Sequence, residues 1–159
     1  LRGARDTVRD TLVVGLGNPL MGDEGVGLCV LERLEEQADR FPDVEFMDLG
    51  TGGMTLVHAL AGRSRVILID CAFMDEPPGT LRRFTPEQVR SRKPRLRQGL
   101  HGGDLLELLE LSDRLGELPA DVVIFGIQPV DISPRRSLSQ KLRDRLQEYA
   151  DRVAAELTP

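Results

Sequence analysis

Residues 11–27 constrain the fold of this chain more than any other segment, because an apolar run there leads directly into a glycine-rich loop. The run Thr-Leu-Val-Val occupies residues 11–14, and residues 15–27 read Gly-Leu-Gly-Asn-Pro-Leu-Met-Gly-Asp-Glu-Gly-Val-Gly. This order, followed by an amphipathic segment, predicts a strand, a sharp turn and a helix, which is half of a βαβ unit. The glycines allow positive φ and a close approach of another group to the main chain. Open α/β sheets bind ligands in loops at the carboxyl ends of strands, so we interpret this loop as a site.

Strand-like and helix-like segments alternate along the rest of the chain. Short apolar runs predict strands at residues 44–49, 65–70, 80–84 and 121–126, and amphipathic spacing predicts helices after 26, over 54–60, from 101 to 111 and from 133 onward. The alternation predicts an α/β fold, a three-layer sandwich in which helices cover both faces of a mostly parallel, twisted sheet of about five strands. We expect one domain over residues 11–159, preceded by a flexible polar leader over residues 1–10.

The composition argues against several classes of function. The 159 residues carry a formal net charge of −5 and a pI near 5.1, which does not suit a nucleic-acid binder. No apolar run approaches the ~18 residues needed to cross a bilayer, so we expect no membrane partner. The two cysteines, Cys29 and Cys71, form no disulfide framework, which indicates the reducing cytoplasm as the default compartment.

Three residues at predicted junctions between elements are candidate metal ligands. Glu24 follows the first strand, Asp70 closes the third, and His101 opens the helix before the last core strand. Loops after neighbouring strands of a doubly wound sheet gather at one edge, so these side chains can converge although they are far apart in sequence. Two carboxylates and one imidazole suit a divalent ion of the zinc, nickel, manganese or iron group and leave coordination positions open. Asp48 closes the second strand and is expected to line the same edge.

Each of these residues also has a simpler interpretation. Asp23 or Glu24 can cap the following helix or lie at its positive end. Asp70 can accept hydrogen bonds from backbone N–H groups in a turn, and His101, beside two glycines, can be a surface loop residue. Cys71 is an alternative candidate, a thiol nucleophile served by His101, although nothing local predicts a depressed pKa for this thiol.

Several other catalytic and binding motifs are absent or incomplete. The sequence has no His-Glu-x-x-His, and its only two histidines, His58 and His101, argue against a histidine-rich zinc site. It has no Gly-x-Ser-x-Gly elbow. Residues 15–17 begin like a dinucleotide fingerprint, but Leu20 stands where that motif requires glycine. Asp48 is the residue that would hold a ribose in such a protein, so a dinucleotide-binding protein remains an alternative.

The glycine-rich loop resembles the opening signature of the hydrogenase maturation endopeptidases. Those enzymes remove a C-terminal extension from the large subunit of NiFe-hydrogenase after nickel has been inserted. The resemblance runs from about residue 11 to the final helix, and its further motifs are Phe-Met-Asp-Leu-Gly-Thr-Gly-Gly-Met at 46–54, Ile-Leu-Ile-Asp-Cys-Ala at 67–72, Pro-Gly-Thr at 78–80 and His-Gly-Gly-Asp-Leu at 101–105. The chain departs from the family at Cys71, where a small residue is common, and over residues 90–97, which have no clear signature.

The resemblance implies a fold of the phosphorylase/hydrolase-like type and a set of site residues. The family's metal ligands correspond to Glu24, Asp70 and His101, and the metal would be nickel supplied by the substrate, while the isolated protein would bind another divalent ion. The group that activates the attacking water is left open between Asp48, Asp70 and a hydroxide on the metal. The residues expected to line the cleft around it are Gly17, Asn18, Asp23, Gly50, Thr51 and Gly52.

The implied partner is the NiFe-hydrogenase large-subunit precursor, cleaved by a monomeric endopeptidase that uses the bound nickel for recognition. One alternative is a metal-sensing chaperone that binds the precursor without cleaving it. A second resemblance, to peptidyl-tRNA hydrolase, rests on residues 15–19. It is weaker, because Leu20 stands where that family has glycine and no histidine lies nearby. The acidic balance of the chain also suits tRNA poorly.

Overall fold

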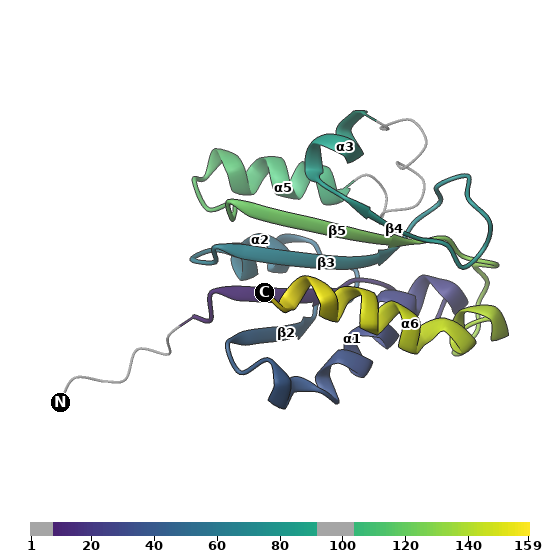
Figure 1. The fold of residues 1–159 in the computed structure, drawn as a ribbon. Coiled ribbons are helices and arrows are strands. Elements are labelled where there is room, and N and C mark those ends of the chain that lie inside the picture. The colour runs from purple at the N-terminus through teal and green to yellow at the C-terminus, as the bar shows by residue number, and fades with distance from the viewer. Residues whose placement is uncertain (1–7, 92–103) are drawn as a thin grey trace.

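A single five-stranded sheet forms the centre of the protein, and the structure, a computed structural model, describes residues 8–91 and 104–159 (Figure 1). The strand order is β2-β1-β3-β5-β4, with β1, β2, β3 and β5 parallel and β4 antiparallel to β5. The strands are β1 (Thr11–Gly15), β2 (Val44–Asp48), β3 (Arg65–Cys71), β4 (Leu81–Phe84) and β5 (Asp121–Ile127). The predicted α/β class and mostly parallel sheet are therefore confirmed.

Helices cover both faces of the sheet, as the amphipathic spacing predicts. The alternation of side chains along each strand feeds two separate cores. Val13, Ile67 and Phe125 pack with the apolar stripes of α1 and α6, whereas Val14 and Leu68 pack with those of α2, α3 and α5. Figure 1 accordingly shows α6 in front of the sheet and α2 behind it. The helices are α1 (Val26–Glu35), α2 (Met54–Leu60), α3 (Pro86–Ser91), α5 (Asp104–Arg114) and α6 (Gln140–Leu157), with 3-10 turns η1 (Gly22–Gly25) and η2 (Ala38–Arg40).

The last helix begins later than the sequence predicts. Ser133-Pro134 has the form of a helix start, but α6 begins at Gln140. The backbone N–H of Ser139 is bonded to the carboxylate of Asp23, and the segment before it makes loop contacts with the first glycine-rich loop. Residues 130–139 therefore form an irregular connection rather than a helix, because the distant loop supplies hydrogen-bond partners for them.

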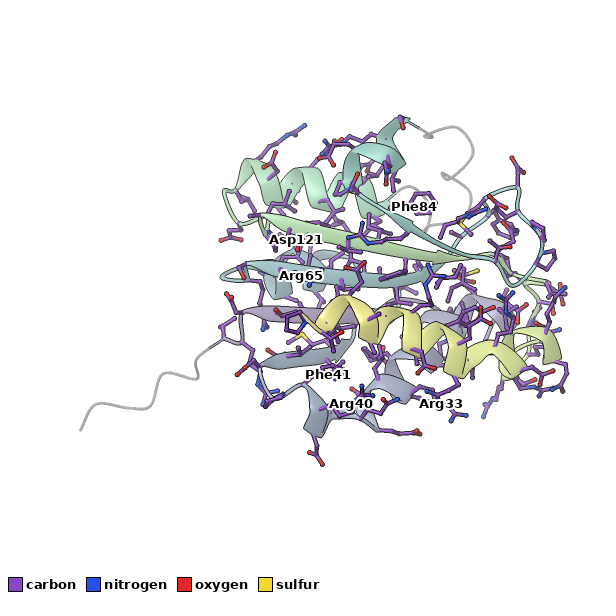
Figure 2. All side chains as sticks on the ribbon, in the orientation of Figure 1. Arg33, Arg40, Phe41, Arg65, Phe84 and Asp121 are labelled. Carbon is purple, nitrogen blue, oxygen red and sulfur yellow. The ribbon has the colours of Figure 1, made fainter. Side chains whose placement is uncertain are left out.

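Ion pairs join the elements at the amino-terminal ends of the central strands. Arg65 of β3 and Asp121 of β5 are register partners and form an ion pair of 2.8 Å (Figure 2). Arg65 also pairs with Glu156 of α6 at 2.8 Å, and Glu156 in turn is bonded to Arg83 of β4. These contacts fix the end of α6 to the sheet at the edge opposite the glycine-rich loops.

Some predictions fall outside the part of the chain that the structure describes. They are His101, most of the basic segment 90–97 and residues 1–7 of the predicted leader. Arg9 and Asp10, the last leader residues, are described. Arg9 donates a hydrogen bond to the carbonyl of Val44 at 2.9 Å, and the carbonyl of Asp10 accepts from the N–H of Arg65. Within the described ranges, no helix is both long and apolar enough to span a membrane.

Candidate active site

The loops that follow the parallel strands are joined to one another at the carboxyl edge of the sheet. The N–H of Gly17, after β1, donates to the carbonyl of Gly50, after β2, at 2.7 Å. The N–H of Leu16 donates to the carbonyl of Ile69, near the end of β3, at 2.9 Å, and the N–H of Ala72 after β3 donates to Ile127 at the end of β5 at 2.9 Å. The convergence that the parallel topology predicts is therefore observed for the backbone.

Two glycines allow the first loop to fold back onto the sheet. Gly17 has φ +152°, and a Cβ atom there would lie 2.3 Å from the carbonyl oxygen of Glu24. A Cβ atom on Gly27, in α1, would lie 2.4 Å from the carbonyl oxygens of both Leu16 and Ile69. No larger residue fits these positions without moving backbone, so glycine is required for η1 and the start of α1 to lie against the end of β3.

The side chain of Asp23 holds two loops together at this edge of the sheet, and we call it the internal clamp. Its side chain has no exposed area, although it carries a charge. Oδ2 accepts hydrogen bonds from the N–H groups of Val130 at 2.9 Å and Asp131 at 3.2 Å, and Oδ1 accepts from the N–H of Ser139 at 2.6 Å. The guanidinium of Arg135 lies 3.7 Å from Oδ1. These donors compensate the cost of burying the carboxylate, so Asp23 ties the loop after β1 to the loop before α6.

The structure places the Asp23 carboxylate between the loop after β1 and the loop before α6, a position that the sequence does not indicate. That Asp23 lines the cleft stays a prediction. Asp23 makes no side-chain cap for the helix that follows, since α1 has no side-chain cap hydrogen bond. The carboxylate instead serves three amides that lie more than 100 residues further along the chain.

Glu24 and Asp70, two of the three candidate metal ligands, come from elements in direct contact. Glu24 lies in η1, which packs against β3, and Asp70 is the penultimate residue of β3. Glu24 is half-buried, and Asp70 has no exposed area. Oδ1 of Asp70 accepts a hydrogen bond from the N–H of Cys71 at 2.8 Å. The third candidate, His101, lies outside the described residues, and no group of three His, Cys, Asp or Glu suited to a metal occurs within them.

The carboxylates at this edge affect the thiol of Cys71. Its pKa is raised far above the usual value, first by burial and then by the negative charges of Asp70, Asp23 and Glu24. All three carboxylates thus lie within electrostatic reach of one buried sulfur atom. A nucleophilic cysteine requires a lowered pKa, so the alternative in which Cys71 is the nucleophile is disfavoured.

The residues predicted around the second glycine-rich turn lie further out. Asp48 is exposed at the end of β2, where its Oδ1 accepts a hydrogen bond from the N–H of Gly50 at 2.9 Å. Because β1 separates β2 from β3, the backbone of Asp48 lies roughly 10 Å across the sheet from the end of β3. Thr51 is exposed and Gly52 is half-buried. Asn18 is half-buried, and its Oδ1 accepts from the N–H of Leu20 at 3.0 Å, which shapes the first loop.

Comparison with known proteins shows which family has this arrangement. The family model described as hydrogenase maturation protease, HycI, matches residues 28–156. The chain is 32% identical over 145 residues to the hydrogenase expression/formation protein HoxM of Cupriavidus necator, a match that covers 88% of this chain and 72% of HoxM. The chain belongs to the hydrogenase maturation protease family.

Further relatives are similar to this maturation protease in sequence and in fold. It is 29% identical over 150 residues to the hydrogenase 2 maturation protease of Escherichia coli, covering 92% of this chain and 89% of that one. The solved structure of the hydrogenase maturating endopeptidase HybD from E. coli superposes with a TM-score of 0.79 at 26% identity, over 92% of this chain and 91% of HybD. The predicted three-layer α/β fold and the predicted enzyme class, a peptide hydrolase, are thereby confirmed.

One residue near the site of the maturation protease, Gln128, has a structural role that the sequence does not indicate. Gln128, directly after β5, is 8% exposed, and its Oε1 accepts hydrogen bonds from the N–H of Met74 at 2.6 Å and, more weakly, of Glu76 at 3.5 Å. Its backbone N–H donates to the carbonyl of Thr80 at 2.9 Å. Gln128 therefore holds the loop after β3 in place. No motif marks a lone glutamine for this role, since its partners are distant in sequence.

Proposed function

We propose that this protein is the endopeptidase that removes the C-terminal extension of a NiFe-hydrogenase large-subunit precursor after nickel insertion. The observation that carries the proposal is the placement of Glu24 and Asp70 on adjoining elements at the carboxyl edge of a maturation-protease fold. This edge is where α/β sheets bind their ligands. The proposal agrees with the names of the relatives, which are maturation proteases of hydrogenases.

Recognition of the precursor would depend on the nickel that the precursor carries. Carboxylate oxygens and an imidazole suit a nickel ion, and a three-ligand set leaves positions for groups from the precursor. Glu24 and Asp70 would supply the oxygen ligands, and His101 is proposed as the nitrogen ligand from the resemblance of its motif. The negative charge gathered around Cys71 favours a cation at this edge. A precursor without nickel would lack the element that these residues bind, so it would not be cleaved.

Two carboxylates remain candidates for the base that activates the attacking water. Asp48 is exposed and therefore accessible to water, but it lies two strands from β3. Asp70 is buried beside η1, close to the proposed binding point of the scissile segment. In either case the carboxylate would hold the water by a hydrogen bond and take its proton as the oxygen attacks the peptide carbonyl. We further propose that the protein works as a monomer in the cytoplasm and that the isolated protein binds another divalent ion.

A precursor-processing assay tests the function. Purified protein is incubated with precursor that carries nickel and with precursor that lacks it, and the large subunit is weighed by mass spectrometry. We expect a shortened large subunit only with the nickel-loaded precursor. Binding of the precursor without shortening would support the chaperone alternative and refute the endopeptidase. Equal cleavage of both precursors would refute nickel-dependent recognition.

Variants of the proposed ligands connect the activity to the site. We expect Glu24→Gln, Asp70→Asn and His101→Ala each to abolish cleavage while the protein stays folded by circular dichroism. Asp113→Asn, which neutralises an exposed carboxylate on α5, is the matched control and should cleave at the wild-type rate. Normal cleavage by any one of the three variants would remove that residue from the site.

A further inference from the structure

Large exposed apolar side chains are concentrated around the candidate active site. Six such residues occur in the described part of the chain, and four of them lie on loops or helix starts that follow the parallel strands. These four are Leu20 after β1, Met54 after β2, Phe73 after β3 and Val130 after β5, with exposed fractions of 56%, 51%, 39% and 47%. We call them the apolar rim. The remaining two, Val8 and Leu115, precede β1 and β5 and so lie at the opposite edge of the sheet.

Backbone hydrogen bonds join the segments that carry the apolar rim. The carbonyl of Leu20 accepts from the N–H of Arg135 at 3.0 Å, and the N–H of Val130 donates to the clamp residue Asp23. Phe73 directly follows Ala72, which is bonded to the end of β5. Met54 begins α2 at the end of the second glycine-rich turn. The same backbone contacts that assemble the site therefore hold the segments that carry Leu20, Phe73 and Val130.

The centre and the border of this surface differ in chemistry. Glu24, which is half-buried, and Asp70, which has no exposed area, lie at the centre. The four members of the rim are uncharged, and their side chains offer no hydrogen-bonding group apart from the weak thioether acceptor of Met54. A free apolar side chain in water is unfavourable, and a group of them at one edge of a protein typically marks a binding surface. The partner that matches is a polypeptide with a cationic centre and apolar side chains on either side of it.

We propose that the apolar rim binds apolar side chains of the large-subunit precursor on both sides of its nickel-bearing segment. This inference rests on the proposed function and extends it, because it assigns affinity for the polypeptide to residues that take no part in metal binding or hydrolysis. The acidic centre would select the loaded metal, and the rim would hold the chain that carries it. Burying these side chains at an interface removes apolar surface from water, which favours binding.

The test compares serine substitutions at the rim with matched substitutions at the opposite edge. The rim variant carries Leu20→Ser, Phe73→Ser and Val130→Ser together. The control carries Val8→Ser and Leu115→Ser, whose exposed fractions of 55% and 56% match or exceed those of two of the three rim residues, Phe73 and Val130. Cleavage of nickel-loaded precursor is followed at several precursor concentrations, and melting temperatures are compared to confirm folding. For the rim variant we expect a KM at least tenfold higher with kcat within threefold of wild type. For the control we expect both constants unchanged.

The possible outcomes separate this proposal from the proposed function. If the wild type cleaves the precursor and the rim variant has the KM of the control, the apolar rim is refuted while the endopeptidase stands. If the wild type binds the precursor without cleaving it, the same comparison is made on Kd by biolayer interferometry, and an unchanged Kd refutes the rim. If the wild type neither binds nor cleaves, both proposals fail. A wild-type dimer that the rim substitutions convert to monomer, by light scattering, would show that a second copy covers the rim and would overturn the proposal.

Discussion

Substitution of Asp23 by asparagine tests the internal clamp most sharply, because it changes one charge and almost no volume. The carboxylate accepts from two amides through Oδ2 and from one through Oδ1. An asparagine has one carbonyl oxygen, so its NH2 group must face at least one of these N–H donors. The variant therefore loses a charge-assisted hydrogen bond, worth about 1.5–3 kcal/mol, and leaves a buried donor unpaired at about 1–3 kcal/mol.

The sum corresponds to a loss of about 2.5–6 kcal/mol in the free energy of unfolding and a fall in melting temperature of about 5–24 °C for a domain of this size. Urea unfolding at pH 7 measures the first and calorimetry the second. Asp131→Asn is the control, since the carboxylate of Asp131 is exposed and, among the described residues, accepts from Ser133 and Arg135 at the surface. Asp131→Asn should lower the free energy of unfolding by less than about 1 kcal/mol. If the free energy of unfolding of Asp23→Asn lies within about 0.5 kcal/mol of the wild-type value, the clamp does not stabilise the loops in the way that its geometry indicates.

The remaining predictions concern two groups whose pKa the fold shifts, Cys71 and Glu156. The raised pKa of Cys71 and its burial predict an inert thiol: in a Cys29→Ala background, Ellman's reagent at pH 8 should modify the native protein at least 100-fold more slowly than the denatured protein, as expected for a buried, uncharged thiol. Cys71→Ala should also cleave the precursor within threefold of wild type, and its inactivity would restore the thiol mechanism. The hydrogen bond from Arg83 lowers the pKa of Glu156, so this carboxylate contributes stability above its unfolded pKa and loses it as the pH falls through the lower folded value. Glu156→Gln should therefore destabilise the protein by about 0.5–1 kcal/mol at pH 7 and by progressively less on acidification below pH 4, as measured by urea unfolding; a difference independent of pH would contradict this.

The sheet could be predicted from the sequence because the signals for it are local. The apolar run at residues 65–70 and the glycines of the first loop each determine their own conformation, and parallel strands connected by helices leave few alternative topologies. Glu24 and Asp70 could be placed at one edge for the same reason, since Glu24 lies in the loop after β1 and Asp70 lies near the end of β3.

The contacts that complete the site could not be predicted, because they join residues that are distant in sequence. Asp23 is adjacent to Glu24 and equally acidic, yet its partners lie beyond residue 129. The same contacts explain why Ser133-Pro134 does not begin a helix, although its sequence is suited to one. Gln128 binds the loop after β3 through its side-chain oxygen, and no periodicity marks it. In each case a single polar side chain is positioned by the packing of two loops.

The central claim is that Glu24 and Asp70 act together on a nickel-bearing precursor, and the rate of its cleavage by Glu24→Gln, Asp70→Asn and the double variant tests this claim most directly. If the two carboxylates serve one site, each single variant should be as inactive as the double variant, at least 1,000-fold below wild type, because residues that act as a unit are strongly non-additive. All three proteins must show wild-type circular dichroism. Single variants that retain more than a tenth of the wild-type rate, with losses that multiply in the double variant, would show that the two residues act independently and would contradict the claim.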